Sequence, residues 1–98
     1  MPETVKSIRG FEWDDGNSGK NEQKHGVTDR EAEEIFFNKP LLVGRSLKGA
    51  PEVRYAALGK TYGSRLLVVV FTIRSRRIRV ISARPMSRKE RKLYEEED

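Results

Sequence analysis

The sequence predicts an α+β domain built on a mostly antiparallel sheet of about four to five strands, with two short helices before the sheet and one after it. Three observations predict this class. Strand-like segments follow one another through residues 41–83 and are joined by short links. Helix-start signals precede them twice, and another follows them at Ser87. Because 98 residues leave room for one domain, we expect residues 1–98 to form a single unit.

The first strand is predicted over residues 8–13, where apolar residues alternate with polar or small ones. The turn-forming residues 14–19 should end it. We then expect a short helix through Glu22 to His25, capped by Asn17 or Ser18. Gly26 should stop this helix, because glycine readily takes the left-handed conformation that is common after a helix.

The second helix should begin at Thr28, because Glu31 stands three residues later and completes a capping box. Three apolar residues at helical spacing should face the core: Ala32, Ile35 and Phe36. Pro40 should end the helical segment, since a proline disfavours helical geometry in the residue before it.

Four strands are predicted next, over residues 41–43, 53–58, 65–73 and 77–83, with 49–51 as a link between the first two. Leu66 to Phe71 is wholly apolar, which predicts a central strand covered on both faces. The short link 74–76 indicates a hairpin that pairs this strand with the last one, although it lacks the Asn-Gly pattern of tight turns.

The C-terminal helix should begin after Ser87, whose capping-box partner is Glu90, and should carry Leu93 and Tyr94. Residues 1–7 and 95–98 are expected to fray. Five aromatic residues are interpreted mainly as core: Trp13, Phe36, Phe37, Tyr55 and Phe71.

Several classes of chemistry find no support in the composition. The chain has no cysteine, which excludes disulfides and thiolate catalysis, and its single histidine makes a zinc site a poor interpretation. Asp14-Asp15 is a weak magnesium candidate and fits a turn better. We expect no metal and no cofactor. The longest wholly apolar run has six residues, against roughly 20 for a membrane span, so we expect a soluble cytoplasmic protein without membrane contact.

The positive charge is concentrated in the second half of the chain. Residues 1–40 carry six Lys/Arg and nine Asp/Glu, a net of −3, whereas residues 41–98 carry fourteen and six, a net of +8. Between Arg74 and Lys92 there are nine basic residues and one acid, Glu90. A local positive field of this kind attracts polyanions, although a charged run can also be only a solvated surface.

The remaining inventory of Arg, Lys, Tyr and one His suits RNA cleavage by the neighbouring ribose hydroxyl. The substrate supplies its own nucleophile, the 2′-OH, so the protein needs neither a covalent residue nor a metal. Arginines stabilise the charge that develops on phosphorus, and a histidine transfers protons near neutral pH. DNA lacks the 2′-OH and would be bound but not cut in this way.

Several segments together resemble the BrnT family of toxins. The likeness covers roughly residues 9–96, and the order and spacing of the segments are more specific than any one of them. The segments are Phe11-Glu12-Trp13-Asp14, Asn21 to Val27, Arg54 to Gly59, Leu66 to Thr72, Arg79-Val80-Ile81-Ser82-Ala83-Arg84, Glu90-Arg91 and Tyr94-Glu95. Residues 27–32 depart from the family's form in being more charged, which concerns the outer face of a helix.

The resemblance implies a RelE-like fold, metal-independent ribonuclease activity that blocks translation, and a cognate antitoxin. That antitoxin would be of the BrnA type, with a ribbon-helix-helix DNA-binding part. Contact with operator DNA would therefore belong to the complex, mainly through the antitoxin.

Four residues are our candidates for the catalytic centre: Lys24, His25, Arg79 and Arg84. Arg84 follows the most basic strand where the chain leaves the sheet, and functional residues are frequent at such positions. Lys24 and His25 could instead only stabilise a helix C-terminus. Further contacts with RNA are predicted for Arg54, Arg65, Arg77 and Tyr94, where surface ion pairs and, for Tyr94, core packing are the alternatives.

Two other functions fit the same sequence. One is a non-catalytic nucleic-acid-binding module that uses basic and aromatic residues on a sheet. The other is a protein-interaction domain whose basic face docks an acidic partner.

Overall fold

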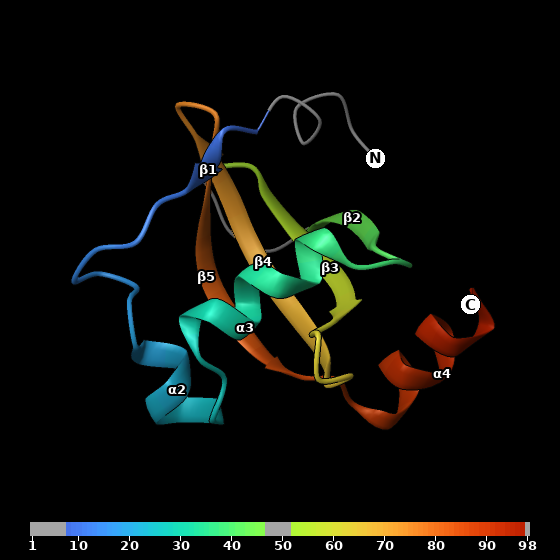
Figure 1. Ribbon diagram of the computed structural model, residues 1–98. Helices are drawn as coiled ribbons and strands as arrows, with labels where there is room; N and C mark the ends of the chain where they lie inside the picture. The colour runs from blue at the N-terminus through green and yellow to red at the C-terminus, as the bar shows by residue number, and fades with distance from the viewer. Residues whose placement is uncertain (1–7, 47–51, 98) are drawn as a thin grey trace.

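The computed structural model describes residues 8–46 and 52–97 (Figure 1). It contains a five-stranded sheet with three α-helices and one 3₁₀-helix around it, so the predicted α+β class is confirmed. The elements in chain order are β1 (Gly10–Phe11), α2 (Lys20–His25), α3 (Asp29–Glu34), η1 (Ile35–Phe37), β2 (Leu42–Ser46), β3 (Arg54–Lys60), β4 (Leu66–Arg74), β5 (Arg77–Pro85) and α4 (Arg88–Glu96). None of the described helices is both long and apolar enough to cross a membrane.

The sheet has the strand order β1-β5-β4-β3-β2, which makes β4 the central strand, as predicted. Strands β2 to β5 pair antiparallel with their chain neighbours, whereas β1 pairs parallel to β5 at Arg77 and Ile78. Ser75 and Arg76 form the hairpin turn, with φ of 49° and 64°. Both values are positive, as the right-handed twist of the flanking strands requires of a two-residue turn.

The strand β5 contains one residue more than β4 needs for regular pairing. Phe71 pairs with Val80 and Val70 pairs with Ser82, so Ile81 is a bulge. A bulge interrupts the alternation of side chains, because every residue after it moves to the opposite face. Val80 and Ala83 therefore both face the main core, although they are three residues apart.

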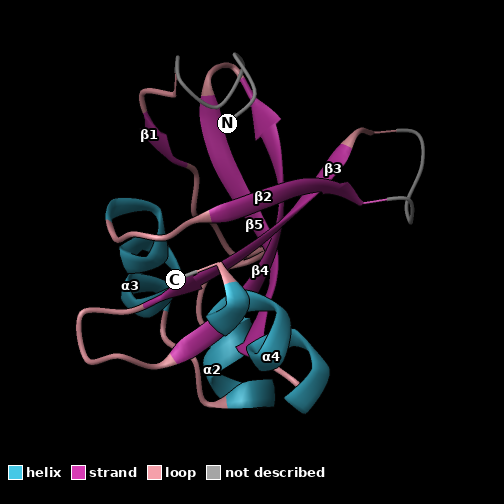
Figure 2. Ribbon diagram, turned by 90° about the vertical axis from the view of Figure 1, so that its right-hand side faces the viewer, coloured by secondary structure: helices cyan, strands magenta, loops and turns pink. Residues whose placement is uncertain are grey.

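Apolar side chains pack on both faces of the sheet, with the larger core under α3 and η1. That core contains Ile35, Leu67, Val69 and Phe71, all fully buried. On the other face a smaller cluster joins Val68 of β4 to Met86 and to Tyr94 of α4. Figure 2 shows α3 beside the sheet at the left, with α2 and α4 at its lower end.

The helix starts are encoded locally and agree with the predictions at two of three positions. Thr28 and Ser87 each form the complete capping box, with Glu31 and Glu90 respectively. The predicted stop of α2 is also confirmed, because Gly26 has φ 67°. The predicted cap of α2 was wrong. Gly19 is the N-cap and has no side-chain bond, while the amide of Asn17 donates to backbone oxygens of Glu12 and Val80.

Two further predictions are corrected. The strand expected over 8–13 pairs only at Gly10–Phe11, because after Glu12 the Asn17 side chain takes over the hydrogen bond to β5. Phe37, expected in the core, is 67% exposed, because it ends η1 at the border of the core, where its ring lies 6.2 Å from that of Phe11 while Phe36 packs against the buried cluster. Residues 95 and 96, for which we expect fraying, lie within α4. The expectations for residues 1–7, 49–51 and 98 fall outside the described residues.

Candidate functional site

Helix α2 lies along the edge of the sheet beside β5, where two asparagines attach it. Beyond Ile78 the outer edge of β5 has no described strand beside it. The Asn17 amide donates to the Val80 carbonyl oxygen at 3.1 Å, and the Asn21 side-chain oxygen accepts from the Ala83 backbone N–H at 3.0 Å. Both asparagines are buried, so these bonds are protected from water and fix α2 against the strand.

A cavity of about 370 Å³ lies between α2 and β5. Two of the catalytic candidates, Lys24 and His25, line it together. The full lining is Lys20, Asn21, Gln23, Lys24, His25, Ile81 and Ser82. None of these residues is acidic, and three carry basic side chains, so the cavity favours an anion. Its floor is the bulge, because Ile81 and Ser82 are the residues at which the alternation of β5 changes.

The bulge also sets where the two arginine candidates emerge. Arg79 pairs with Thr72, and Arg84 pairs with Val68. Because Thr72 and Val68 are four residues apart on a regular part of β4, both arginines emerge from the face opposite the main core. Ser82, paired with Val70, lies between them on that face. Arg79 and Arg84 therefore flank the cavity along β5, although neither lines it.

Arg79 is held by two carboxylates. Its guanidinium donates to Glu12 at 2.9 Å and to Asp14 at 2.9 and 3.0 Å, and its side chain is only 15% exposed. The hydrogen bond from Arg79 lowers the pKa of Asp14 below its usual value, with help from the Gly16 backbone N–H. Gly16 lies directly against this guanidinium: a Cβ there would be 2.8 Å from the Arg79 Nη2 atom, so the end of the arginine would have to shift. In the structure, the turn after β1, which contains Asp14, therefore covers the Arg79 guanidinium.

Arg84 forms a two-pronged ion pair with Glu90 of α4. The two N–O distances are 2.7 and 2.8 Å, and the Arg84 side chain is 40% exposed. The hydrogen bonds from Arg84 are the largest cause that lowers the pKa of Glu90 to about 2. Since Glu90 also accepts from the Ser87 backbone N–H, one carboxylate both caps α4 and holds the arginine.

The four predicted RNA contacts are not on one surface. Arg77 is exposed at the hairpin end of β5, and Arg54 begins β3. The Arg54 Nε atom is buried without a hydrogen-bond partner among the described residues. Arg65 binds Glu31 at 2.9 Å and the Gly26 carbonyl oxygen at 3.0 Å, beside α3. Tyr94 is 2% exposed and donates to the Pro40 carbonyl oxygen at 2.6 Å, so it is a core residue here, the alternative weighed above.

The sequence reasoning did not select Lys20, Ser82 or Ile81 as site residues. Lys20 could have been found, because residues four apart share a helix face and Lys24 was already a candidate. Ser82 and Ile81 lie at the cavity because of the bulge, and no residue of β5 indicates a bulge from the sequence. Within the part of the chain that the structure describes, no group of three or more His, Asp or Glu residues could hold a metal ion.

One comparison with known proteins gives a match. The model of the family described as the ribonuclease toxin, BrnT, of type II toxin-antitoxin systems matches residues 13–90. That range contains α2, β5 and the candidate residues 24, 25, 79 and 84. No curated protein matches the chain.

Proposed function

The chain belongs to the BrnT family of ribonuclease toxins of type II toxin-antitoxin systems, and we propose that it cleaves RNA at the cavity between α2 and β5. Cleavage would proceed without a metal ion, by attack of a ribose 2′-OH on the adjacent phosphodiester. The products would carry 2′,3′-cyclic phosphate and 5′-hydroxyl ends.

The observation that carries this proposal is the charge and composition of the cavity. Lys20, Lys24 and His25 line it, and none of the described lining residues carries a carboxylate. A phosphodiester placed there would meet ammonium and imidazole groups, together with the Ser82 hydroxyl and the amides of Asn21 and Gln23. Such donors stabilise the added negative charge of the phosphorane transition state. His25 or Lys24 would take the 2′-OH proton and return a proton to the leaving 5′ oxygen.

Arg84 and Arg79 would join this centre as phosphate ligands by exchanging partners. A guanidinium presents the same fork of donors to a carboxylate and to a phosphate. Glu90 thus occupies the position on Arg84 that a phosphate oxygen pair would take, and Asp14 does the same on Arg79. Arg77, on the same strand, would extend the contact along the RNA.

The biological setting follows from the family. A type II toxin has a protein antitoxin, and we propose that the antitoxin of this chain is of the BrnA type. The toxin would inhibit translation by cutting RNA when the antitoxin is lost, and would reach operator DNA only within the complex.

Cleavage of a labelled RNA in the presence of EDTA tests the proposal. We expect the wild type to cut with cyclic-phosphate ends and to leave unchanged a copy of the substrate with 2′-deoxyribose at the cut. Lys24→Ala and His25→Ala should each lower the rate by about 10²-fold or more. Lys39→Ala and Lys92→Ala are matched controls, because both lysines are exposed outside the cavity.

Three results would contradict the proposal: complete dependence on a divalent metal, cleavage of the deoxy substrate, or full activity in both cavity variants. Stable binding of RNA without any cutting would favour a non-catalytic module instead.

A further inference from the structure

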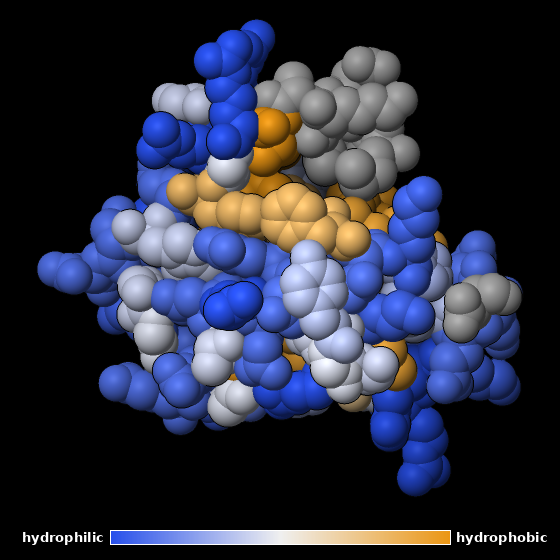
Figure 3. All heavy atoms as spheres, viewed as in Figure 1, coloured by the Kyte–Doolittle hydropathy of each residue, from blue (hydrophilic) through white to orange (hydrophobic). Residues whose placement is uncertain are grey.

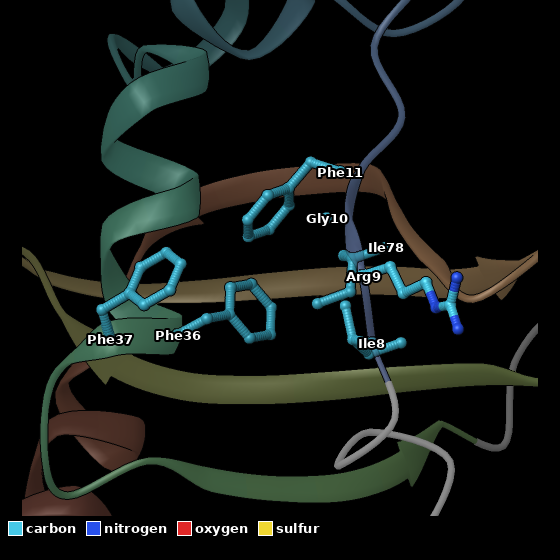
Figure 4. A pocket seen from close by; sticks show the side chains of 7 residues that line it. All are labelled: Ile8, Arg9, Gly10, Phe11, Phe36, Phe37 and Ile78. Atoms are coloured by element: carbon cyan, nitrogen blue, oxygen red, sulfur yellow. The ribbon is translucent and has the colours of Figure 1, made fainter.

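A groove lined by apolar side chains lies on the α3 side of the sheet, between β1 and η1 (Figure 4). Its volume is about 380 Å³. The rings of Phe11, Phe36 and Phe37 form one wall, with centroids 5.7 Å apart for Phe11–Phe36 and 6.2 Å for Phe11–Phe37. Ile8 and Ile78 complete the apolar lining. A second hollow of about 280 Å³ continues past Phe36 and Phe37 to Leu41. We call the two hollows together the phenylalanine groove.

No described residue covers the phenylalanine groove, although most of its lining is apolar. Phe37 is 67% exposed, and in Figure 3 apolar residues form an orange band across the upper part of a mostly hydrophilic face. Small proteins seldom leave a large aromatic group and a contiguous apolar surface in water, and such a surface with a polar border is typical of a binding site for another protein.

The border of the groove carries positive charge. Arg9 stands at one hollow and Lys39 at the other, and both are exposed. No acidic residue is among the described residues that line either hollow. The ligand that complements this surface is therefore apolar in the middle and acidic at its ends.

The position of β1 favours a polypeptide as that ligand. β1 is the outermost strand of the sheet, so its outer side faces no other described strand. An extended chain in the groove could pair with that backbone while its side chains contact the phenylalanines. A small apolar molecule would fill the hollows but would not pair with the backbone of β1.

We propose that the phenylalanine groove is the docking surface for the antitoxin, which contributes an apolar segment flanked by acidic residues. This inference rests on the proposed function, which supplies the antitoxin as the partner. Among the described residues, the groove and the cavity beside α2 share no lining residue, and they meet β5 at different positions: Ile78 for the groove, Ile81 and Ser82 for the cavity. β1 pairs at Arg77 and Ile78, whereas α2 binds at Ala83. Mutations can therefore separate antitoxin binding from RNA cleavage.

Calorimetric titration with the purified product of the reading frame adjacent to this gene tests the docking surface. Phe37→Asp should weaken binding by about tenfold or more, because a charge replaces an apolar contact. Leu93→Asp is the matched control: Leu93 is 54% exposed on α4, away from the groove, and we expect less than about a twofold change. Arg9→Glu should also weaken binding, most at low salt, and Lys92→Glu should not.

An unchanged affinity in both Phe37→Asp and Arg9→Glu would overturn the inference. So would a toxin dimer, seen by sedimentation, that Phe37→Asp dissociates without affecting antitoxin binding, because the groove would then hold a second copy. RNA cleavage is measured separately. Phe37→Asp should cut RNA at the wild-type rate and should resist inhibition by the antitoxin. If the wild type cuts no RNA, the proposed function is contradicted, but the comparison of antitoxin binding still tests the groove.

Discussion

Arg79 and Arg84 emerge from the same face of the sheet because Ile81, an extra residue in β5, shifts the alternation between them. In a regular strand, residues five apart lie on opposite faces. Arg84 would then lie on the face of Ile78 and Val80, which are both buried under α3. The bulge thus keeps Arg84 out of the core and places it beside the cavity.

Deletion of Ile81 should leave the core in place but loosen α2. Without the extra residue, Val80 and Ala83 keep their partners Phe71 and Val69 and still face the core. The deletion shortens β5 between the Val80 carbonyl and the Ala83 N–H, which bind Asn17 and Asn21, so one of these buried hydrogen bonds should be lost at a cost of about 1–3 kcal/mol. Ile81→Ala retains the bulge and should cost less, because Ile81 is 37% exposed. Urea unfolding of the two variants measures the difference, and a deletion variant as stable as Ile81→Ala would show that the attachment of α2 does not need the bulge.

The sequence predicted the features of the fold that depend on near neighbours. Thr28 with Glu31, Ser87 with Glu90, and Gly26 are signals within four residues, and all three act in the structure as expected. The bulge could not be predicted, because Val80, Ile81 and Ser82 carry no glycine or other mark of irregular pairing. It depends on how β5 aligns with β4.

In the candidate site, too, only the features that depend on near neighbours in the sequence could be predicted. Lys24 and His25 are adjacent in sequence and line one cavity, so a local motif was enough to place these two candidates side by side. Asn17 and Asn21 bind β5 across 63 and 62 residues of chain, and Arg79 meets Asp14 across 65. Partners so distant become visible only when the fold is known.

Asn21→Ala should loosen α2 from the sheet. The substitution leaves the buried Ala83 N–H without its acceptor, which costs about 1–3 kcal/mol in the free energy of unfolding. Asn21→Asp keeps an acceptor oxygen in the same place and should recover most of that loss. Gln23→Ala, an exposed change on the same helix, is the control. Amide hydrogen exchange at Ala83 should be faster in Asn21→Ala alone, and equal protection in all variants would exclude this attachment.

The Arg84–Glu90 pair should make stability depend on pH in the acid range. The pKa of Glu90 is lowered from 4.5 to about 2, so its ionised form favours the folded state. The pair stabilises fully above about pH 4.5, and this contribution disappears as the pH falls towards 2. Other lowered carboxyl pKa values act in parallel, so the relevant quantity is the difference in unfolding free energy between wild type and Glu90→Gln. That difference should shrink between pH 4.5 and 2, and a difference independent of pH would contradict the pairing.

Glu90→Gln should also tighten the binding of RNA, if Arg84 binds phosphate. Glutamine retains a capping-box side chain at the start of α4 but removes the carboxylate that holds the arginine. A freed guanidinium adds one phosphate contact, which makes the slope of log K against log salt steeper by about 0.7 for single-stranded RNA. The readout is the affinity for an uncleavable 2′-deoxy substrate at several salt concentrations.

Two comparisons separate this effect from a general change of charge. Glu95→Gln removes the same charge from the same helix, but Glu95 is exposed and has no bond to Arg84, so the slope should stay that of the wild type. Adding Arg84→Ala to Glu90→Gln should cancel the gain, because the freed group is then missing. If Glu90→Gln and Glu95→Gln bind alike, Arg84 remains a structural partner of α4, and the phosphate must be held by Lys20, Lys24 and His25 alone.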